Sequence, residues 1–417
     1  NILDINRDQN VQMGSCNINK LELDCESCIL NAEGSHIDSL ISVKPGQNLN
    51  IDRVIVDGHW KTNGSCSGYI TISGKNYPDT NNIQLNGTCD FQYMIFKGLT
   101  ISGNVPVTPF NSIFDGPSQG LNISSYTPRT LFWVNGDGNW GDNNHWSSSS
   151  GGIGGECIPT KFDDVIFDSQ SSAPGNFDVY LNHIYSYCNS LHFIRQGKIN
   201  PGTSISPSIE IYGNLETDSL MSLFVTNHLI SDSGTNYINS RSQNFGSKLQ
   251  LEGNGAIELI HSLKSNNGIN INVNSFYTRG YQINCAKFLL DNSKILNVYL
   301  DTSTINSQEF QGVRTNNAHY IDGDSSNINC TLFWVNNNNF NIVNSTGSID
   351  CDTCNANLLT GKDIAINNSN IKRAITTPGP NGGFGIKDSH VEYVQLNNSD
   401  GNFTYNSLID TLIFNMP

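Results

Sequence analysis

Two Cys-x-x-Cys motifs are the first residues in this sequence whose type and spacing could do chemistry. They occupy residues 24–28, DCESC, and residues 350–354, DCDTC. A structural zinc site would need both pairs brought together to supply four ligands. A redox pair would need thiols with a lowered pKa, whereas the acidic neighbours favour the protonated thiol. We therefore favour structural disulfides, with a metal site and a redox site as the alternatives.

The remaining cysteines extend this interpretation. The chain has 11 cysteines, which fits an oxidising compartment better than the cytosol. Neighbours along the chain give the predicted pairs: Cys25 with Cys28, Cys66 with Cys89, Cys157 with Cys188, Cys285 with Cys330, and Cys351 with Cys354, which leaves Cys16 over. Each wider bridge would tie adjacent turns of the chain and stabilise the fold by about 3 kcal/mol. Sequence order alone leaves other connectivities open.

Acidic and basic side chains in the second half could form the site of a polysaccharide lyase or hydrolase. The candidates are Asp291, Asp301, Asp322 and Asp324, with Arg279 or Arg314 beside them. These aspartates stand at repeated corner positions, where Asp is common because it turns the chain. We therefore predict that the protein is not an enzyme and has no catalytic residues and no cofactor. A β-helical carbohydrate-active enzyme and a glycan-binding module remain as alternatives.

A metal site is the other chemistry to consider, in residues 137–142. Their sequence, DGNWGD, places oxygen ligands at alternating positions, as in a calcium loop. Asp and Asn are equally expected there for turning the chain. We expect His145 to pack beside Trp140 and Trp146, and we expect these tryptophans to be structural. The prediction is therefore that no residue binds a metal, with a calcium loop as the alternative.

The composition describes a protein with few charges and no basic surface. Of 417 residues only 14% are charged, and the net charge is −15. Without a basic face the chain cannot neutralise phosphates, so we predict no nucleic acid partner. No run of about 18 apolar residues is present, so we predict no membrane insertion. The first residues, NILDIN, lack an initiator Met and a signal pattern, and we expect a mature product or an excised segment.

The elements that must position these side chains are β-strands. No long segment has apolar residues at helical spacing, whereas β-branched residues alternate with polar ones throughout. Asp57-Gly58 and Asn86-Gly87 would by themselves indicate hairpin turns. We therefore predict an all-β chain of short strands.

A repeat in the second half points to one all-β architecture. An apolar residue, then Asn or Asp, then Ser, then another apolar residue recurs with its serines at 369, 389 and 407, spaced by 20 and 18 residues. Repeats of about 20 residues with the same corner chemistry are typical of a solenoid. We predict right-handed parallel β-helix (solenoid) units in tandem, with tandem β-sandwich repeats as the alternative.

Two copies of Thr-Leu-Phe-Trp-Val, beginning at Thr130 and Thr331, divide the chain into units. We predict that residues 1–129 are the C-terminal part of one solenoid unit, 130–330 a complete unit, and 331–417 the beginning of a third. Neither end of the sequence offers a capping helix, so we expect the chain to be a window on a longer array.

The stretch from 130 to 168, rich in Trp and Gly, resembles a known repeat. It contains, in this order, Phe-Trp-Val, Gly-Asp-Gly-Asn-Trp, His-Trp-Ser, Ser-Gly-Gly, Pro-Thr and Asp-Val-Ile-Phe-Asp. These sub-motifs resemble a repeat of very large surface proteins that gliding bacteria secrete through the type IX system, among them the SprB-type gliding adhesins. The sequence departs from that pattern at Asn135, where Gly is usual, at Gly141, where Ser is usual, and at Cys157.

The resemblance implies a section of a large extracellular adhesin filament on the cell surface, which mediates attachment and gliding motility. Its partners would be an extracellular surface or polysaccharide, neighbouring repeats of the same long chain, and the gliding and secretion machinery through parts outside this segment. The resemblance also implies glycans on Asp-Ser/Thr-aliphatic sites, which occur at Asp38-Ser39-Leu40, Asp218-Ser219-Leu220 and Asp410-Thr411-Leu412.

Overall fold

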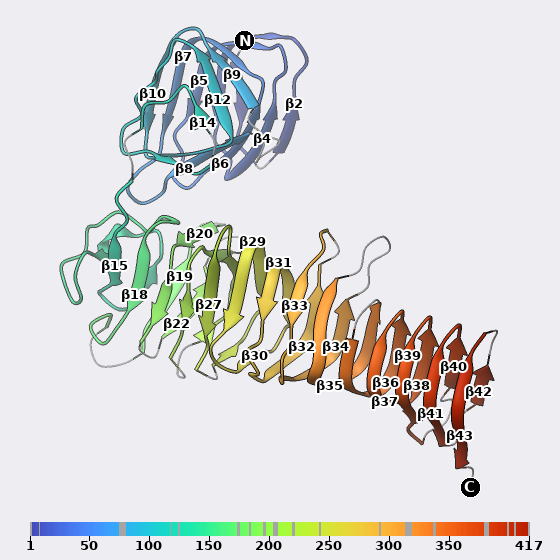
Figure 1. Cartoon of the computed structure of the whole chain (residues 1–417). Coiled ribbons are helices and arrows are strands. Elements are labelled where there is room, and N and C mark those ends of the chain that lie inside the picture. The colour runs from blue at the N-terminus through green and yellow to red at the C-terminus, as the bar shows by residue number, and fades with distance from the viewer. Residues whose placement is uncertain are drawn as a thin grey trace. The chain divides into compact units, whose positions relative to one another are not determined.

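The computed structural model contains two compact units (Figure 1). Unit 1 comprises Asn1–Arg129, Trp140–Ser148 and Ile153–Ile158, and unit 2 comprises Thr130–Asn139, Ser149–Gly152 and Pro159–Pro417. The structure describes residues 2–7, 9–74, 81–116, 118–123, 126–172, 176–182, 185–194, 197–202, 207–218, 222–241, 243–291, 293–312, 319–336, 339–378, 383–397, 400–403 and 406–415.

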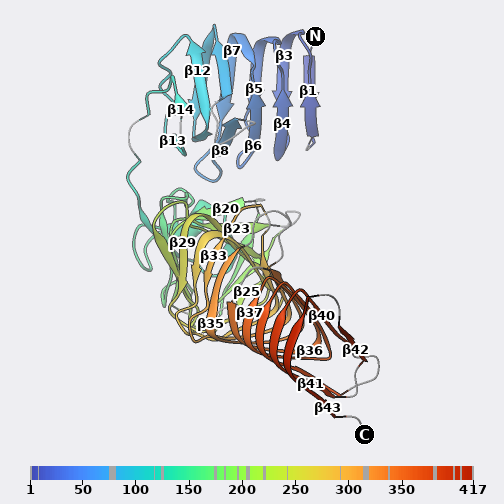
Figure 2. The ribbon, with the colours of Figure 1, turned by 45° about the vertical axis from the view of Figure 1, so that its right-hand side comes forward.

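Unit 1 is built from two parallel sheets, between which the chain alternates (Figure 2). The first sheet contains β1 (Ile2–Ile5), β3 (Asn17–Leu23), β5 (His36–Ser42), β7 (Ile55–Asn63), β9 (Asn81–Leu85), β12 (Leu99–Gly103) and β14 (Ser118–Gln119), with β10 (Thr88–Gln92) beside β7. The second contains β2 (Gln9–Gln12), β4 (Ser27–Asn31), β6 (Asn48–Asp52), β8 (Ile70–Gly74), β11 (Met94–Lys97) and β13 (Ile113–Phe114). The outlying segment 140–148 carries the 3-10 helix η1 (Asn143–His145) and β17 (Trp146–Ser147).

Equivalent positions of successive turns fill the core of unit 1. Leu3 pairs with Leu21, Leu21 with Leu40, and Leu40 with Trp60. Leu21, Leu40 and Trp60 are fully buried, because alternate residues of each strand point inward. One apolar core therefore runs through the turns of this unit.

Unit 2 continues the same construction over more strands (Figure 1). A small sheet holds β16 (Gly138–Asn139), β19 (Asp178–Leu181), β22 (Lys198–Pro201) and β25 (Ser222–Leu223). The long sheet path begins with β15 (Thr130–Trp133), β18 (Asp164–Phe167), β20 (Tyr185–Cys188), β21 (Leu191–Phe193), β23 (Ser208–Ile211), β24 (Leu215–Glu216), β26 (Thr226–Ile230), β27 (Thr235–Asn239), β28 (Asn244–Phe245), β29 (Leu249–Leu259), β30 (Leu263–Ser265) and β31 (Ile269–Tyr277). It ends with β32 (Ile283–Leu290), β33 (Asn297–Tyr299), β34 (Thr304–Gly312), β35 (Tyr320–Asn336), β36 (Asn339–Asp352), β37 (Asn355–Gly361), β38 (Asp363–Asn367), β39 (Asn370–Thr376), β40 (Gly383–Lys387), β41 (His390–Asn397), β42 (Asp400–Phe403) and β43 (Leu408–Asn415).

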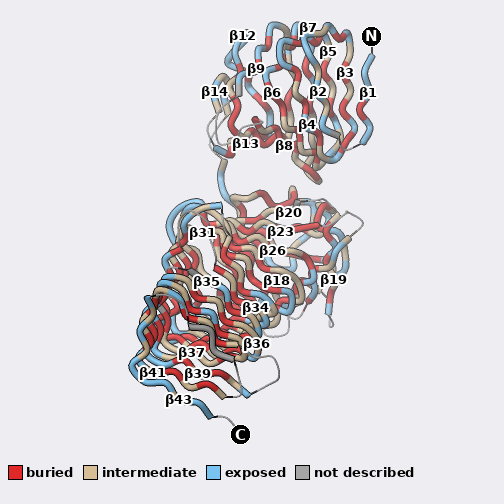
Figure 3. The backbone as a smooth tube through the Cα atoms, turned by 90° about the vertical axis from the view of Figure 1, so that its right-hand side faces the viewer, coloured by how far each residue is buried: buried red, intermediate tan, exposed pale blue. Residues whose placement is uncertain are grey.

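The prediction of a parallel β-helix is confirmed. The described strands pair in parallel, apart from one isolated antiparallel bridge between Ser65 and Gly68, and the chain forms a β-solenoid of about 18 turns. Inward residues stack from turn to turn: the rings of Phe288 and Phe310 lie 4.8 Å apart, and those of Phe310 and Phe333 lie 5.3 Å apart. Figure 3 shows buried residues alternating with exposed ones along the strands. The alternating pattern thus reflects a core that is shared between neighbouring turns.

The repeated serines are corner residues, as their spacing predicts. Asn368 and Asp388 take positive φ angles of 47° and 48°, which Asn and Asp tolerate better than most residues. Each is followed by a buried serine, and the Ser389 hydroxyl accepts a hydrogen bond from the backbone N–H of Ser369 at 2.9 Å. Cys354 occupies the same position one turn earlier, and its N–H donates to the Ser369 hydroxyl at 2.8 Å. The corner chemistry therefore links consecutive turns.

The two dipeptides that indicate hairpins have a different role. Asp57-Gly58 lies inside β7, and Asn86-Gly87 follows β9, both in parallel pairings. A Cβ on Gly58 would collide with the carbonyl oxygen of Asp38, and a Cβ on Gly87 would collide with that of Gly58. Glycine is needed because the backbones of successive turns approach closely here, and not because the chain reverses.

The two Thr-Leu-Phe-Trp-Val copies fold in opposite registers. In the first, Leu131 and Trp133 are fully buried, whereas in the second Phe333 is fully buried and Trp334 is 44% exposed. A shift of one residue moves every side chain of a strand to the other face. Unit 2 also continues through Thr331, inside β35, where we expected a third unit to begin.

The described residues contain no helix long and apolar enough to cross a membrane.

Candidate functional site

A long groove follows an interruption of strand pairing that recurs in successive turns of unit 2. The register of β35 with β36 shifts between Cys330 and Leu332, and the pairings of β32 with β34 and of β34 with β35 skip residues at the equivalent place. Residues on both sides of this irregularity line an open groove of about 720 Å³, within the range of ligand sites. We call this the amide groove; it is lined by Lys264, Asn266, Asn284, Asn306, Ser307, Gln308, Asn329, Thr331, Asn344, Thr346, Thr360 and Thr377, with Ser265, Cys285, Ala286, Cys330 and Ser345.

An unbroken ladder of asparagine amides runs along the groove. Asn306 donates from Nδ2 to Oδ1 of Asn284 at 2.8 Å, and Asn329 donates to Asn306 at 2.8 Å. Asn344 continues the ladder by donating to Asn329 at 3.1 Å. The strand register places these side chains on the same face of adjacent strands. A primary amide has two N–H groups and two carbonyl lone pairs, so Asn306 and Asn329 each keep a donor and an acceptor for a ligand.

Small serine and cysteine side chains form the floor of the groove. Cys285 pairs in register with Ser265 on one side and with Ser307 on the other, and Cys330 pairs with Ser345. The Ser307 hydroxyl is buried and has no hydrogen-bond partner among the described residues. Burial raises the pKa of the Cys285 and Cys330 thiols to about 12 in each case, so neither is a nucleophile near neutral pH.

The lining offers hydrogen-bonding groups and one charged side chain. Its described residues include no carboxylate and no imidazole, and Lys264 is the one with a charge. The groove crosses β30, β32, β34, β35, β36 and β37 and ends after β39, and six gaps of about 4.8 Å make it roughly 29 Å long. It therefore matches an extended, uncharged ligand with many hydroxyl groups.

The residues considered for catalysis are spread over different corners. Asp291 follows β32 and accepts a hydrogen bond from the backbone N–H of Ser293 at 2.8 Å. Partial burial acts to raise the pKa of Asp291, but hydrogen bonds from Ser293 and the nearby His319 and Lys294 hold it below its usual value. Asp301 is an exposed corner residue with a φ of 48°. Both aspartates thus turn the chain, as their corner positions predict.

Arg279 is engaged by a glutamate that the sequence argument did not select. Its guanidinium donates to Oε2 of Glu258 at 2.8 and 3.0 Å, and this hydrogen bond is the main reason why its pKa is raised. Asp301 is close enough to contribute to the same shift. Asp322 lies in β35; Arg314 and the side chain of Asp324 lie outside the described residues. The structure brings Arg279 and Asp301 together but places Asp291 at another corner.

A row of tyrosines follows the same side as Arg279. The rings of Tyr277 and Tyr299 stack at 4.6 Å with an angle of 4°, and Tyr320 lies 5.8 Å from Tyr299 at 59°. Arg279 covers the ring of Tyr277 at 4.6 Å. Because the faces of Tyr277 and Tyr299 contact each other and Arg279 covers Tyr277, these two rings stabilise neighbouring turns more than they offer a stacking surface to a ligand, whereas Tyr320 is 51% exposed.

The segment considered as a calcium loop uses its carboxylates to hold the backbone. Asp142 accepts a hydrogen bond from the N–H of Asn144 at 3.0 Å and caps η1, and Asp137 accepts from the N–H of Asp178 at 2.8 Å. Trp140 and Trp146 are buried and pack edge to face at 4.9 Å, as the structural interpretation predicts. Within the described part of the chain, no group of three or more His, Cys, Asp and Glu residues could hold a metal ion.

Asn135, just before the glycine-rich part of this segment, has a positive φ angle. Its φ is 69°, a left-handed conformation that Gly adopts without strain and that Asn adopts more readily than most residues.

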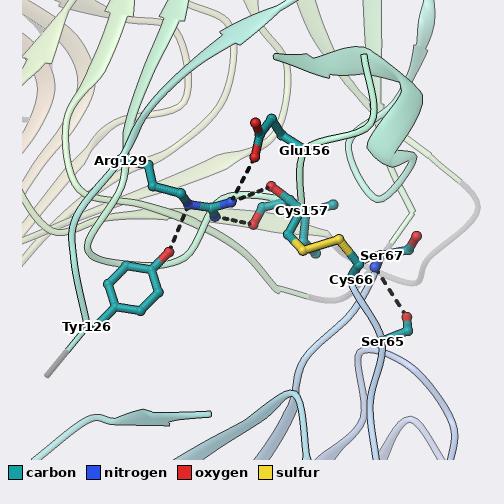
Figure 4. The surroundings of a disulfide bond; sticks show 8 residues. Ser65, Cys66, Ser67, Tyr126, Arg129, Glu156 and Cys157 are labelled. Carbon is teal, nitrogen blue, oxygen red and sulfur yellow. Dashed lines mark hydrogen bonds and ion pairs between the residues drawn. A yellow bond between two sulfur atoms is a disulfide. The ribbon is translucent and has the colours of Figure 1, made fainter. Parts of the chain in front are cut away.

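The disulfides differ from most of the predicted pairs. Cys25–Cys28 is confirmed, but Cys66 bonds to Cys157, with their Cα atoms 4.5 Å apart (Figure 4). The predicted Cys66–Cys89 and Cys157–Cys188 pairs are therefore wrong, and Cys16, Cys89 and Cys188 are thiols. Burial is the main reason why the pKa of the Cys89 thiol is raised to about 11.

Two further predicted bridges are also absent. Cys285 and Cys330 lie two turns apart with Ser307 between them, about 10 Å, which exceeds the reach of a disulfide. Cys351 and Cys354 are buried thiols at the two ends of one corner, and a hydrogen bond to Cys354, with burial, raises the pKa of Cys351 well above its usual value. A reactive thiolate is therefore not favoured at this motif.

Arg129 holds the segment that carries Cys157 (Figure 4). Its guanidinium donates to the carbonyl oxygens of Cys157 and Ile158 at 3.3 and 3.1 Å, and its Nε donates to the Tyr126 hydroxyl at 3.0 Å. Glu156 lies 3.8 Å from the same guanidinium. The disulfide is thus supported by a charged hydrogen-bond network.

The groove asparagines were missed by the sequence argument. Asn is unfavourable inside strands, so Asn284, Asn306, Asn329 and Asn344 within β-rich segments were a usable signal.

No family model, no curated protein and no solved structure matches this chain.

Proposed function

We propose that this chain is a non-catalytic attachment section of an extracellular surface protein, whose amide groove binds an extended, uncharged polysaccharide. The observation that carries the proposal is the amide ladder from Asn284 to Asn344. It repeats hydrogen-bonding amides over four successive turns, which suits a polymer that repeats its hydroxyl groups. Such a surface exchanges bound water for ligand hydroxyls without leaving buried polar groups unpaired.

Charge supports a neutral ligand over an acidic one. The chain has a net charge of −15, and the groove itself has one cationic residue, Lys264. An acidic polysaccharide would therefore be repelled by the protein as a whole. Catalysis receives no support from the groove, because its described lining has no carboxylate and no imidazole that could act as a general acid or base.

The role in an adhesin filament and in gliding rests on the resemblance of residues 130–168. A solenoid suits that role because its length grows with the number of turns, and each turn is stabilised by its neighbours. Cells whose parent gene lacks this segment should attach poorly to polysaccharide-coated surfaces and should glide less. Unchanged attachment and gliding would contradict the adhesin proposal.

Affinity electrophoresis tests the binding proposal directly. The chain is run through gels that contain dextran, laminarin or galactomannan, and through gels that contain alginate or polygalacturonate. We expect retardation by at least one neutral polymer and none by the acidic ones. Replacing Asn306 and Asn329 together by Leu removes two ladder amides, worth about 1 kcal/mol each, so affinity should fall roughly 30-fold.

Asn357→Leu is the matched control. Asn357 also donates to an asparagine of the adjacent turn, Asn341, at 3.0 Å, but it does not line the amide groove. The control should bind like the unmodified chain. Equal retardation of all three proteins, no retardation by any neutral polymer, or new reducing ends in the gel would each refute the proposal.

A further inference from the structure

Trp334 differs from the other tryptophans of the chain in its exposure. The side chain is 44% exposed, whereas Trp60, Trp133, Trp140 and Trp146 are at most 1% exposed. A large aromatic side chain at the surface forgoes the stabilisation that burial would provide. Exposed tryptophans are also enriched where proteins bind ligands and partners, because the ring offers a rigid apolar face beside a polar edge.

A cavity of about 430 Å³ lies beside this indole. We call it the tryptophan pocket; its lining includes Trp334, Asp350, Asp352, Asn367, Asn368 and Lys387. Trp334 pairs in register with Asp350 of the next turn, and Asp350 pairs with Ala365 of the turn after. The following position in this row is Gly385, where a Cβ would have no atom within 4 Å. Small residues therefore leave open space beyond Asp350 in this row.

The polar side chains around the pocket combine acceptors and donors. Asp352 accepts a hydrogen bond from Nδ2 of Asn368 at 3.0 Å and stands two residues after Asp350 on the same face of β36. Asn367 pairs in register with Asp352 on one side and with Lys387 on the other. An aromatic face with carboxylates, amides and an ammonium group beside it matches a sugar ring, which has an apolar face of C–H groups and a rim of hydroxyls.

We infer that the tryptophan pocket is a saccharide subsite, in which one ring of a neutral glycan stacks on Trp334 and its hydroxyls bond to Asp350, Asp352 and Asn367. The class of ligand rests on the proposed function, but the site does not include the amide groove. Lys387 disfavours an organic cation as the occupant, and the net charge of −15 disfavours a nucleotide.

Intrinsic fluorescence tests this inference, because Trp334 is the one tryptophan that solvent reaches. The chain is titrated with cellohexaose, laminarihexaose, maltohexaose and mannohexaose while tryptophan emission and acrylamide quenching are recorded. We expect at least one hexasaccharide to shift the emission to shorter wavelength and to protect Trp334 from the quencher.

Two variants separate the site from general effects on folding. Trp334→Ala should abolish the response and weaken hexasaccharide binding about 10-fold, because it removes a stacking contact worth roughly 1.4 kcal/mol. Ala365→Leu keeps the indole but fills the space beside Asp350, so it should abolish the response while the thermal transition stays unchanged. Tyr320→Ala, which truncates an aromatic that is 51% exposed outside the pocket, is the control and should respond normally.

The outcomes distinguish this inference from the proposed function. One result would refute the saccharide subsite and leave the groove proposal standing. In that result, hexasaccharides bind the unmodified chain without changing its tryptophan emission, and Trp334→Ala binds them with unchanged affinity. The variant with Asn306 and Asn329 replaced binds them more weakly. A response to tetramethylammonium and to no sugar would identify a cation site and would also refute it. If no hexasaccharide binds the unmodified chain, both proposals fail.

Discussion

Removal of the Cys66–Cys157 disulfide is a perturbation whose cost follows directly from the structure. Both cysteines belong to unit 1, and the bridge closes a loop with a sequence separation of 91 residues, which also includes residues 130–139 and 149–152 of unit 2. In the chain-entropy account, a loop of n residues lowers the entropy of the unfolded chain by roughly 2.1 + 1.5R ln n cal/mol/K. For a separation of 91 this is about 15.5 cal/mol/K, so replacing both cysteines by Ser should cost about 4.6 kcal/mol at 25 °C.

The Cys25–Cys28 disulfide is the matched control, because it lies in the same unit and spans a separation of only 3 residues. The same relation gives about 1.6 kcal/mol for its removal.

In the variant with Cys66 and Cys157 replaced by Ser, the hydrogen bonds from Arg129 to residues 157 and 158 persist, because they use backbone oxygens.

Native-state hydrogen exchange of peptides from β3 to β12 measures the opening free energy of unit 1 without contributions from unit 2. We expect these peptides to lose about three times more protection free energy when Cys66 and Cys157 are replaced than when Cys25 and Cys28 are replaced. Equal losses in the two variants would refute the reasoning.

The remaining predictions concern single residues. Phe310→Ala removes the middle ring of a fully buried stack and should destabilise unit 2 by about 3–5 kcal/mol in urea denaturation, against no more than about 1 kcal/mol for Phe310→Leu. Gly87→Ala should lower the melting temperature, because its Cβ would meet the carbonyl oxygen of Gly58; an unchanged melting temperature would contradict the close approach. Cys285, with a pKa of about 12, should resist iodoacetamide at pH 8 in the folded protein and react in urea, as mass spectrometry can show. Burial, followed by repulsion from a neighbouring carboxylate, raises the pKa of Asp350, so the ionised form opposes folding. The free-energy cost of ionising Asp350 in the folded protein is absent below pH 3.8, the ordinary pKa of Asp, and grows as the pH rises toward the raised pKa. Asp350→Asn should therefore stabilise the protein at pH 7 but not at pH 3.

The solenoid could be predicted from the sequence because its information is local and repeated. Ser369 and Ser389 recur with the same neighbours, because each corner turns the backbone through the same positive φ angle and hydrogen bond. The alternating strands follow for the same reason, because each turn buries one face against the shared core. The repeated sequence pattern was therefore sufficient to predict the solenoid fold.

The register of single strands could not be predicted in the same way. The identical pentapeptides at Thr130 and Thr331 place their tryptophans on opposite faces, because pairing with the neighbouring turns decides which face is buried. The bridge from Cys66 to Cys157 joins positions that sequence proximity does not connect. Both outcomes depend on contacts between turns.

The amide groove is intermediate in predictability between the solenoid fold and the register of single strands. Its asparagines are spaced by 22, 23 and 15 residues, from 284 to 306, 329 and 344, because turns differ in length. A fixed period would not bring them together, and the interruption of strand pairing beside which the groove lies has no marker in the sequence.

The most direct test of the account is the dependence of affinity on ligand length. Isothermal titration of the chain with a neutral glycan series, from disaccharide to octasaccharide, measures whether successive sugars occupy successive turns of the amide groove. We predict that affinity rises with each added sugar until the ligand spans the groove, roughly 29 Å, and that the rise disappears when Asn306 and Asn329 are replaced by Leu. Equal affinity for disaccharide and octasaccharide, or no heat of binding at any length, would contradict the account.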